Sequence, residues 1–308
     1  MPGTVNTPPS RRTADGHGFA ATSIVAAPDA INSVPTTAPG PEQSRAQLRR
    51  HGRWLIGSLL LAQALFVFYL LATFGRTVIA GNVAAWAQLS AKGWVAGDRA
   101  GNTAMVLHLA FAVLILLLGA IQLSQRVRQR APALHRWSGR LYLGGCYIAA
   151  ISGLWLVWVR GTVGDRLQHI AITINALLLF LCAIMAWRTA RSRRIAEHRT
   201  WALRAFLVGN GVLYFRMFLA LWLLVFRAPV GFTPSTFSGP FLTTLAFTVY
   251  VFGPLSVFET YRWAERSTSR TRHRVASGVM IGMSLLLVCG ATAAVLVLWM
   301  PRILRVAI

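Results

Sequence analysis

The stretch TAMVLHLAFAVLILLLGAIQLS, residues 103–124, contains no acidic side chain and no basic one apart from a single histidine. A helix that crosses a bilayer needs about 20 apolar residues, and this stretch is long enough. In lipid, such a run must satisfy its own backbone hydrogen bonds, so it is predicted to be a helix. Six similar runs surround it, at roughly 54–74, 137–159, 167–187, 200–226, 240–261 and 275–300.

The composition of the whole chain favours the same class. The 308 residues are 55% apolar and only 13% charged, which is unlike an ordinary soluble domain. The sequence predicts an all-α polytopic membrane bundle of about seven transmembrane helices over residues 54–300, with a four-helix core at 103–226. Residues 1–50 are rich in Pro, Ala, Thr and Ser and are predicted to be a disordered cytoplasmic tail. Residues 301–308 are predicted to be a short C-terminal tail.

The basic residues predict the orientation in the membrane. All but one of the 31 are Arg, a bias typical of high-GC bacteria. They gather before the first run and in the loops 125–136, 188–199 and 262–274, whereas the intervening loops are nearly neutral. This alternation is typical of membrane proteins whose arginine-rich loops lie in the cytoplasm. The sequence therefore predicts a multi-pass protein of the bacterial cytoplasmic membrane with a cytoplasmic N-terminus. The chain has a net charge of +23, and its arginine clusters are expected to bind anionic lipids at the inner surface rather than nucleic acid.

Four histidines at the ends of four successive runs give the main lead on chemistry. In the predicted topology, His108 and His169 lie near the outer ends of their helices, and His135 and His198 lie at the inner ends of theirs. Each pair comes from alternate helices of the four-helix core. Two neutral imidazoles on facing helices are what a bis-histidine haem iron needs. The hypothesis is that two haems are stacked across the bilayer as a path for electrons.

The inner pair also has a simpler interpretation. His-Arg dipeptides recur where odd-numbered runs enter the membrane from the inner side, at His135-Arg136, His198-Arg199 and His273-Arg274. Polar residues that only mark the boundary between lipid tails and headgroups would give the same pattern.

Three arginines lie within the apolar runs, where an unpaired charge is costly. Arg216, deep in the fifth run, is predicted to face the outer histidine pair and neutralise a haem propionate. The alternatives are that it hydrogen-bonds Asn175 and backbone carbonyls, or that it reaches outward to water. Arg140 and Arg204 follow the inner histidines and are candidates for contacts with the propionates of an inner haem. Glu259 is the predicted ion-pair partner of either one.

Two segments carry a resemblance to known families. The segments LHRWSGRLYL (134–143) and EHRTWALRAFLVGNGVLYFR (197–216), with the upstream His108 and His169, resemble DUF 2306, a family of uncharacterised bacterial membrane proteins, over about residues 55–265. One histidine on each of four consecutive helices also resembles the b-561-type transmembrane cytochromes. That second resemblance implies that His108 with His169, and His135 with His198, each hold a haem b. It leaves the electron donor and acceptor open, since the chain carries no ascorbate-site motif.

The leading functional hypothesis is therefore a di-haem b electron carrier that moves electrons across the cytoplasmic membrane, as a transmembrane oxidoreductase. Two alternatives stay open. One is a small-molecule or ion transporter with Arg216, Asn175 and Asn210 in a polar cavity, which a discontinuous helix in this region would favour. The other is an accessory membrane protein without a cofactor.

Overall fold

The computed structural model describes residues 41–90 and 92–307, and within them the chain is all-α without a β-strand. This confirms the predicted fold class. The part of the predicted tail at residues 1–40 lies outside the described residues.

Six helical segments are long and apolar enough to cross a membrane. A seventh is formed if a pair of helices bent by 44° counts as one span, which agrees with the predicted number of about seven. The continuous segments are α1 (Pro41–Leu70) with η1 (Leu71–Gly75) and α2 (Arg76–Ile79), α4 (Arg99–Leu123), α6 (Pro132–Trp158), α7 (Arg166–Arg191), α10 (Pro240–Phe247) with η3 (Thr248–Phe252) and α11 (Gly253–Glu265), and α12 (Arg270–Ala293) with η4 (Ala294–Trp299) and α13 (Met300–Ala307). The bent pair is α8 (Ile195–Gly209) and α9 (Gly211–Phe226), and the connections contain η2 (Val83–Ala85), α3 (Trp86–Leu89) and α5 (Gln125–Arg130).

Side-chain caps explain where several of these helices begin. The carboxylate of Asp98 accepts a hydrogen bond from the backbone N–H three residues on, and Asp165 does the same at the start of α7. Ser124 caps α5 and Ser269 caps α12 in the same way. Each cap satisfies a backbone donor that the helix itself cannot pair and contributes about 1 kcal/mol.

The helices extend beyond the predicted bundle at both ends. Residues 41–50, predicted to belong to the tail, form the first turns of α1. The physical reason is Leu48, whose side chain is fully buried against the neighbouring helices by Ala264, Ala276 and Met280. At the other end, residues 301–307 continue the last span as α13 instead of forming a tail.

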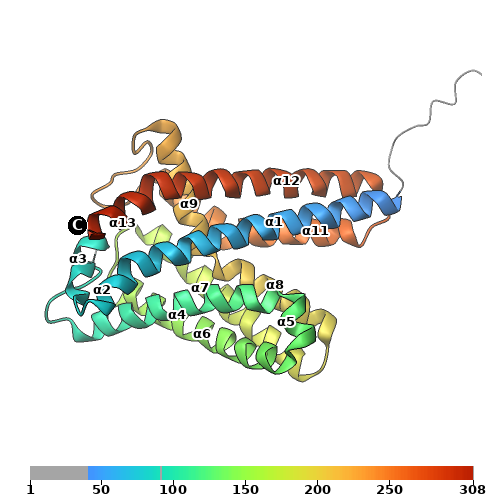
Figure 1. The fold of residues 1–308 in the computed structure, drawn as a ribbon. Coiled ribbons are helices and arrows are strands. Elements are labelled where there is room, and N and C mark those ends of the chain that lie inside the picture. Colours follow the sequence, from blue (N-terminus) through green and yellow to red (C-terminus); the bar gives the residue numbers. More distant parts are fainter. Residues whose placement is uncertain (1–40, 91, 308) are drawn as a thin grey trace, which may run out of the picture. The chain divides into compact units, whose positions relative to one another are not determined.

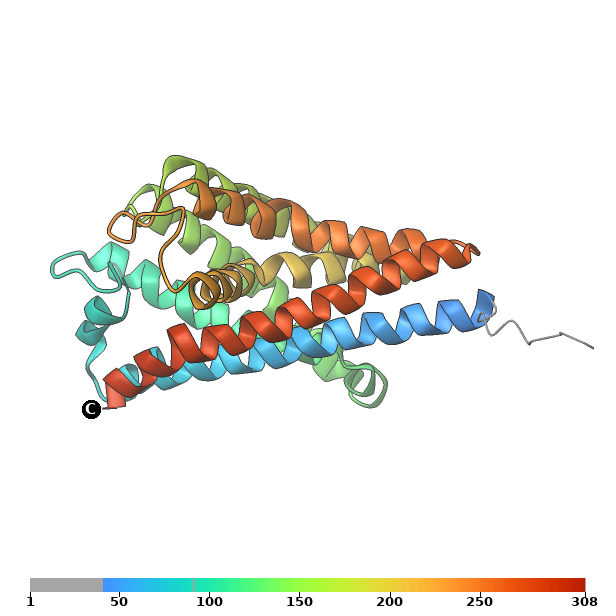
Figure 2. The same ribbon diagram turned by 90° about the horizontal axis from the view of Figure 1, so that it is seen from above.

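The helices pack as two groups that share α9. In the first group α1 runs beside α12, as Figures 1 and 2 both show. In the second, α4 packs on α6, α6 on α7, and α7 on α8, while α8 touches α4. The second group corresponds to the predicted four-helix core. α9 leaves the end of α8 and packs against α12, η3 and η4.

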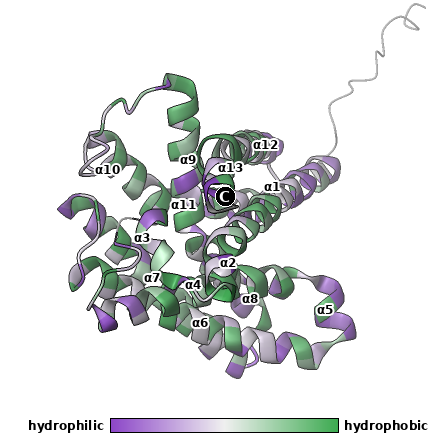
Figure 3. Cartoon of the chain, turned by 60° about the vertical axis from the view of Figure 1, so that its left-hand side comes forward, coloured by the Kyte–Doolittle hydropathy of each residue, from purple (hydrophilic) through white to green (hydrophobic). Residues whose placement is uncertain are grey.

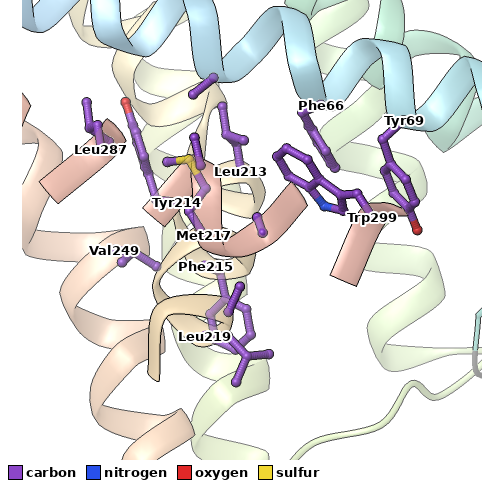
Figure 4. Close-up of a cluster of buried hydrophobic side chains, with 14 of the residues drawn as sticks. Phe66, Tyr69, Leu213, Tyr214, Phe215, Met217, Leu219, Val249, Leu287 and Trp299 are labelled. Atoms are coloured by element: carbon purple, nitrogen blue, oxygen red, sulfur yellow. The ribbon is translucent and has the colours of Figure 1, made fainter. Parts of the chain in front are cut away.

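An aromatic cluster joins the two groups in the interior. Trp299 stacks on Phe66 and on Tyr69, with ring centroids 5.5 Å and 5.8 Å apart. Figure 4 shows these three rings beside the α9 residues Leu213 and Met217. All five side chains are buried. α1, α9 and η4 therefore meet at this cluster.

The basic connections lie together at one end of the bundle, which we call the arginine-rich end. It comprises the start of α1, α5, the α7–α8 connection and the α11–α12 connection. Figure 1 shows the start of α1, α5 and the α11–α12 turn on the same side, away from α3 and α13. Figure 3 shows hydrophilic residues concentrated on α5 and the start of α1, whereas the long helices are mostly hydrophobic.

Candidate functional sites in the bundle

The four histidines lie on the diagonals of the four-helix group. Since α4, α6, α7 and α8 pack in ring order, α4 faces α7 across the group, and α6 faces α8. His108 and His169 are on the first diagonal, and His135 and His198 are on the second. The helix order thus matches the pairing that the sequence predicted, although helix order alone does not bring the rings into contact.

The rings of the outer pair have different neighbours. His108 points at α6, where its Nδ1 lies 2.9 Å from the carbonyl oxygen of Ala149. His169 folds back towards its own N-terminal loop, with Nε2 3.4 Å from the carbonyl oxygen of Val163 and its ring edge against Trp158. Among the described residues, no direct contact joins His108 and His169. Their shared role therefore stays a prediction.

The inner pair is closer together. The imidazoles of His135 and His198 are within electrostatic range of each other. His198 Nδ1 lies 2.9 Å from the carbonyl oxygen of Ala186 on α7. His135 Nδ1 is buried and has no hydrogen-bond partner among the described residues. A buried ring nitrogen without a partner costs free energy, so it calls for a ligand, a water or a functional explanation.

The two inner arginines have other partners. Arg204 holds Glu259 through two nitrogens, at 3.0 Å and 2.6 Å, which confirms the ion pair predicted for Glu259. Its guanidinium also lies over the ring of Trp201. Arg140 is exposed and lies over the ring of Trp137, 4.7 Å from its centroid. Neither arginine touches His135 or His198 in the described part of the chain.

Arg216 lies in the interior, between α9 and α1. Its guanidinium is 5.6 Å from the ring centroid of Phe66 and interacts electrostatically with Tyr69 and His108. Tyr69 also accepts a hydrogen bond of 3.4 Å from Arg302 of α13. Two guanidiniums therefore lie near one phenol, and neither forms an ion pair with an acidic side chain within residues 41–90 and 92–307.

A further hydrogen-bond donor at this level is the indole of Trp299. Trp299 is 1% exposed, stacks on Tyr69, and has a buried indole N–H without a hydrogen-bond partner. Together with Arg216 and Arg302 it makes this region rich in donors and positive charge. Sequence reasoning singled out only Arg216. It missed the others because they come from the first and last spans, which no local motif links to α9.

The bend between α8 and α9 is fixed by asparagines. Asn210 separates the two helices, and its side-chain N–H donates to the carbonyl oxygen of Phe206 at 2.8 Å. Asn175 of α7 donates to the carbonyl oxygens of Val208 and Tyr250, at 3.3 Å and 2.9 Å. Tyr250 lies in η3, a π-helical turn, so Asn175 connects two interruptions of regular α-helix. Such interruptions often mark functional positions. Asn175 makes these bonds rather than the predicted one to Arg216.

These features define a polytopic helical membrane protein with polar positions in its interior. Residues 105–252 match the model of a family described as "Predicted membrane protein (DUF2306)". The resemblance found in the sequence is thereby confirmed, over a shorter region than the predicted 55–265. No curated protein matched the chain. The search of solved structures likewise gave no match.

Proposed function

We propose that this integral membrane protein is a di-haem b electron carrier of the bacterial cytoplasmic membrane. The observation that supports it most is that the histidines occupy the two diagonals of the four-helix group, one pair towards each end. Histidines on two adjacent helices, which pack directly together, would leave no room for a haem ring between them. Histidines on diagonally opposed helices can reach the shared interior from both sides.

The hydrogen-bond partners of the ring nitrogens indicate which histidines fit an iron. A metal-bound histidine usually donates its other N–H to a carbonyl or carboxylate, which fixes the tautomer and orients the ring. His108 and His198 each have Nδ1 at 2.9 Å from a backbone carbonyl, which leaves Nε2 free. His135 has a buried nitrogen without a partner. The inner pair therefore fits well, whereas His169 would have to turn away from Val163 to join His108.

The protein's own residues would then have separate tasks. Haem b, when bound, supplies reversible one-electron exchange. The four imidazoles would hold the two haems, and the carbonyls of Ala149 and Ala186 would keep His108 and His198 in one tautomer. Arg216, close to His108 and without an acidic partner, would balance a propionate. Arg204 is already paired with Glu259 and Arg140 is exposed, so neither supports the proposal further.

The test is a reduced-minus-oxidised absorption spectrum of the purified full chain with a haem assay. The parent is expected to show a b-type spectrum and about two haems per chain, whereas His198→Ala and His108→Ala should each lose about one. His273→Ala is the matched control. It changes a buried histidine that bonds the Ser267 carbonyl and belongs to neither pair. A colourless parent, produced with haem in excess, would refute the proposal.

A second candidate function is a transporter for a small anion, and the break at Asn210 favours it. Transporters bind solutes at discontinuous helices, and here a 44° bend precedes the Arg216–Tyr69–Arg302 cluster. Proteoliposomes should then take up labelled phosphate or acetate faster than empty liposomes. Arg216→Leu should abolish the difference. Equal uptake in both would exclude these anions as substrates.

A further inference from the structure

A cavity of about 810 Å³ lies between helices at the arginine-rich end. Its walls come from α1, α4, α8, α9, α10, η3, α11 and α12. Neither the four paired histidines nor the residues of the Arg216 cluster line it. Ligand sites of small molecules typically enclose about 300–1,000 Å³. The cavity is therefore large enough to hold a substantial part of an organic ligand.

One end of the cavity is strongly basic. Its lining there includes Arg49, Arg53, Arg199 and Arg262, with Glu265 as the acidic member. Arg49 lies 3.6 Å from Glu265, and Arg262 pairs with Glu259 at 3.1 Å. Arg53 and Arg199 have no ion-pair partner in the part of the chain that the structure describes. Two uncompensated guanidiniums at a membrane boundary favour an anionic group.

The rest of the cavity is apolar. Aliphatic, aromatic and methionine side chains line it away from the arginines, among them Leu59, Leu207, Phe218, Leu245, Met280 and Leu287. Leu286 of α12 also lines the cavity and is 38% exposed. The cavity therefore reaches the lipid-facing surface beside α12, where a hydrocarbon chain can enter from the bilayer.

We propose that this cavity binds one anionic phospholipid of the surrounding membrane. The phosphate would sit between Arg53 and Arg199, and an acyl chain would lie in the apolar part. Charge complementarity selects an anionic headgroup, and the lining beyond the arginines selects an attached hydrocarbon chain. A free inorganic anion would leave most of the cavity empty, and a neutral lipid would leave the two arginines unpaired. This inference does not depend on the proposed haems.

The test is native mass spectrometry of the purified full chain with phosphatidylglycerol and phosphatidylcholine supplied at equal concentration. The parent is expected to retain one phosphatidylglycerol in preference to phosphatidylcholine. The double variant Arg53→Gln with Arg199→Gln should lower that occupancy at least about tenfold, because two charge-assisted contacts are lost. Its control is Arg266→Gln with Arg274→Gln, which removes the same charge at the same end from exposed residues outside the cavity lining.

A second variant separates the cavity from a merely charged surface. Leu203→Trp fills part of the lining without changing charge, and should also displace the lipid, whereas Leu177→Trp on an exposed face should not. If only the arginine variant loses lipid, binding is superficial and the proposal is wrong. Equal retention of both lipids would also overturn it. So would thermal stabilisation by inorganic phosphate alone equal to that by phosphatidylglycerol.

Discussion

At the scale of single residues, Arg216 shows how the fold accommodates a charge inside a membrane bundle. An isolated arginine at the centre of a span costs about 2.5 kcal/mol or more on insertion scales. Here the guanidinium lies over the ring of Phe66 and interacts electrostatically with Tyr69. Arg302 donates a hydrogen bond to the hydroxyl of Tyr69. The position of Arg216 inside a span could be read from the sequence, but its partners could not, because they lie more than a hundred residues away.

The hydroxyl of Tyr69 gives the first prediction. Tyr69→Phe should lower the free energy of unfolding by about 1–3 kcal/mol, because Arg302 loses its acceptor and Arg216 loses a polar neighbour. Unfolding of the purified protein in detergent measures this. Tyr147→Phe is the control, since Tyr147 stacks on Phe180 and its hydroxyl has no hydrogen-bond partner among the described residues. Tyr147→Phe should change the free energy of unfolding by no more than about 0.5 kcal/mol. Equal effects of the two substitutions would contradict the assigned role of Tyr69.

Asp165 gives a prediction about pH. Burial raises the pKa of this carboxyl, but hydrogen bonds from Gln168, Thr243 and the Gly239 backbone outweigh it and hold the pKa below its usual value of 3.8. The fold therefore favours the charged form. Its stabilising contribution is complete above the unfolded-state pKa and is lost as the pH falls through the lower, folded-state value.

The corresponding experiment compares the unfolding temperature of the parent and Asp165→Asn between pH 6 and pH 2.5. The parent should lose more stability than the variant on acidification below about pH 4, because only the parent has this carboxyl to protonate. Other acidic groups titrate in both proteins and cancel in the difference. Parallel curves would show that Asp165 does not contribute to the acid sensitivity.

At the scale of helices, hydrophobic length predicted which segments are helical but not where the helices begin, end or bend. The extension of α1 back to Pro41 depends on Leu48 meeting α11 and α12, a contact that no local pattern shows. The bend at Asn210 is similar. The run 200–226 is long and apolar enough to be one span, yet Asn175 on another helix binds the carbonyl of Val208 beside the bend.

The close approach at this bend gives the element-scale prediction. A Cβ atom at Gly211 would come within 2.7 Å of the Tyr250 ring, so Gly211→Ala should lower the free energy of unfolding by about 1–3 kcal/mol through overpacking. Gly282→Ala is the matched control, because nothing lies within 4 Å of its Cβ. It should be neutral or stabilising by up to about 1 kcal/mol. If Gly211→Ala behaves like Gly282→Ala, the α9–η3 contact is looser than described.

At the scale of the whole molecule, the sequence predicted the class and the approximate number of spans because both follow from the length and spacing of apolar runs. The helix order that puts the histidines on diagonals also follows from a simple sequential bundle. The ring orientations do not, since His108 and His198 are oriented by carbonyls of neighbouring helices and His169 by a carbonyl of its preceding loop. The cavity was missed for a similar reason, because its walls come from segments between Arg49 and Leu287.

The orientation in the membrane is a prediction about the whole chain. The arginine-rich end should face the cytoplasm because arginines close to spans are retained on that side. In a variant lacking Cys146, Cys182 and Cys289, single cysteines at Gln129 and Ser235 would report the two ends, since both positions are exposed. A membrane-impermeant maleimide applied to intact cells or spheroplasts should label Ser235→Cys directly. It should label Gln129→Cys only after the membrane is permeabilised. Labelling of Gln129→Cys from outside would reverse the orientation and would place the proposed lipid cavity in the outer leaflet.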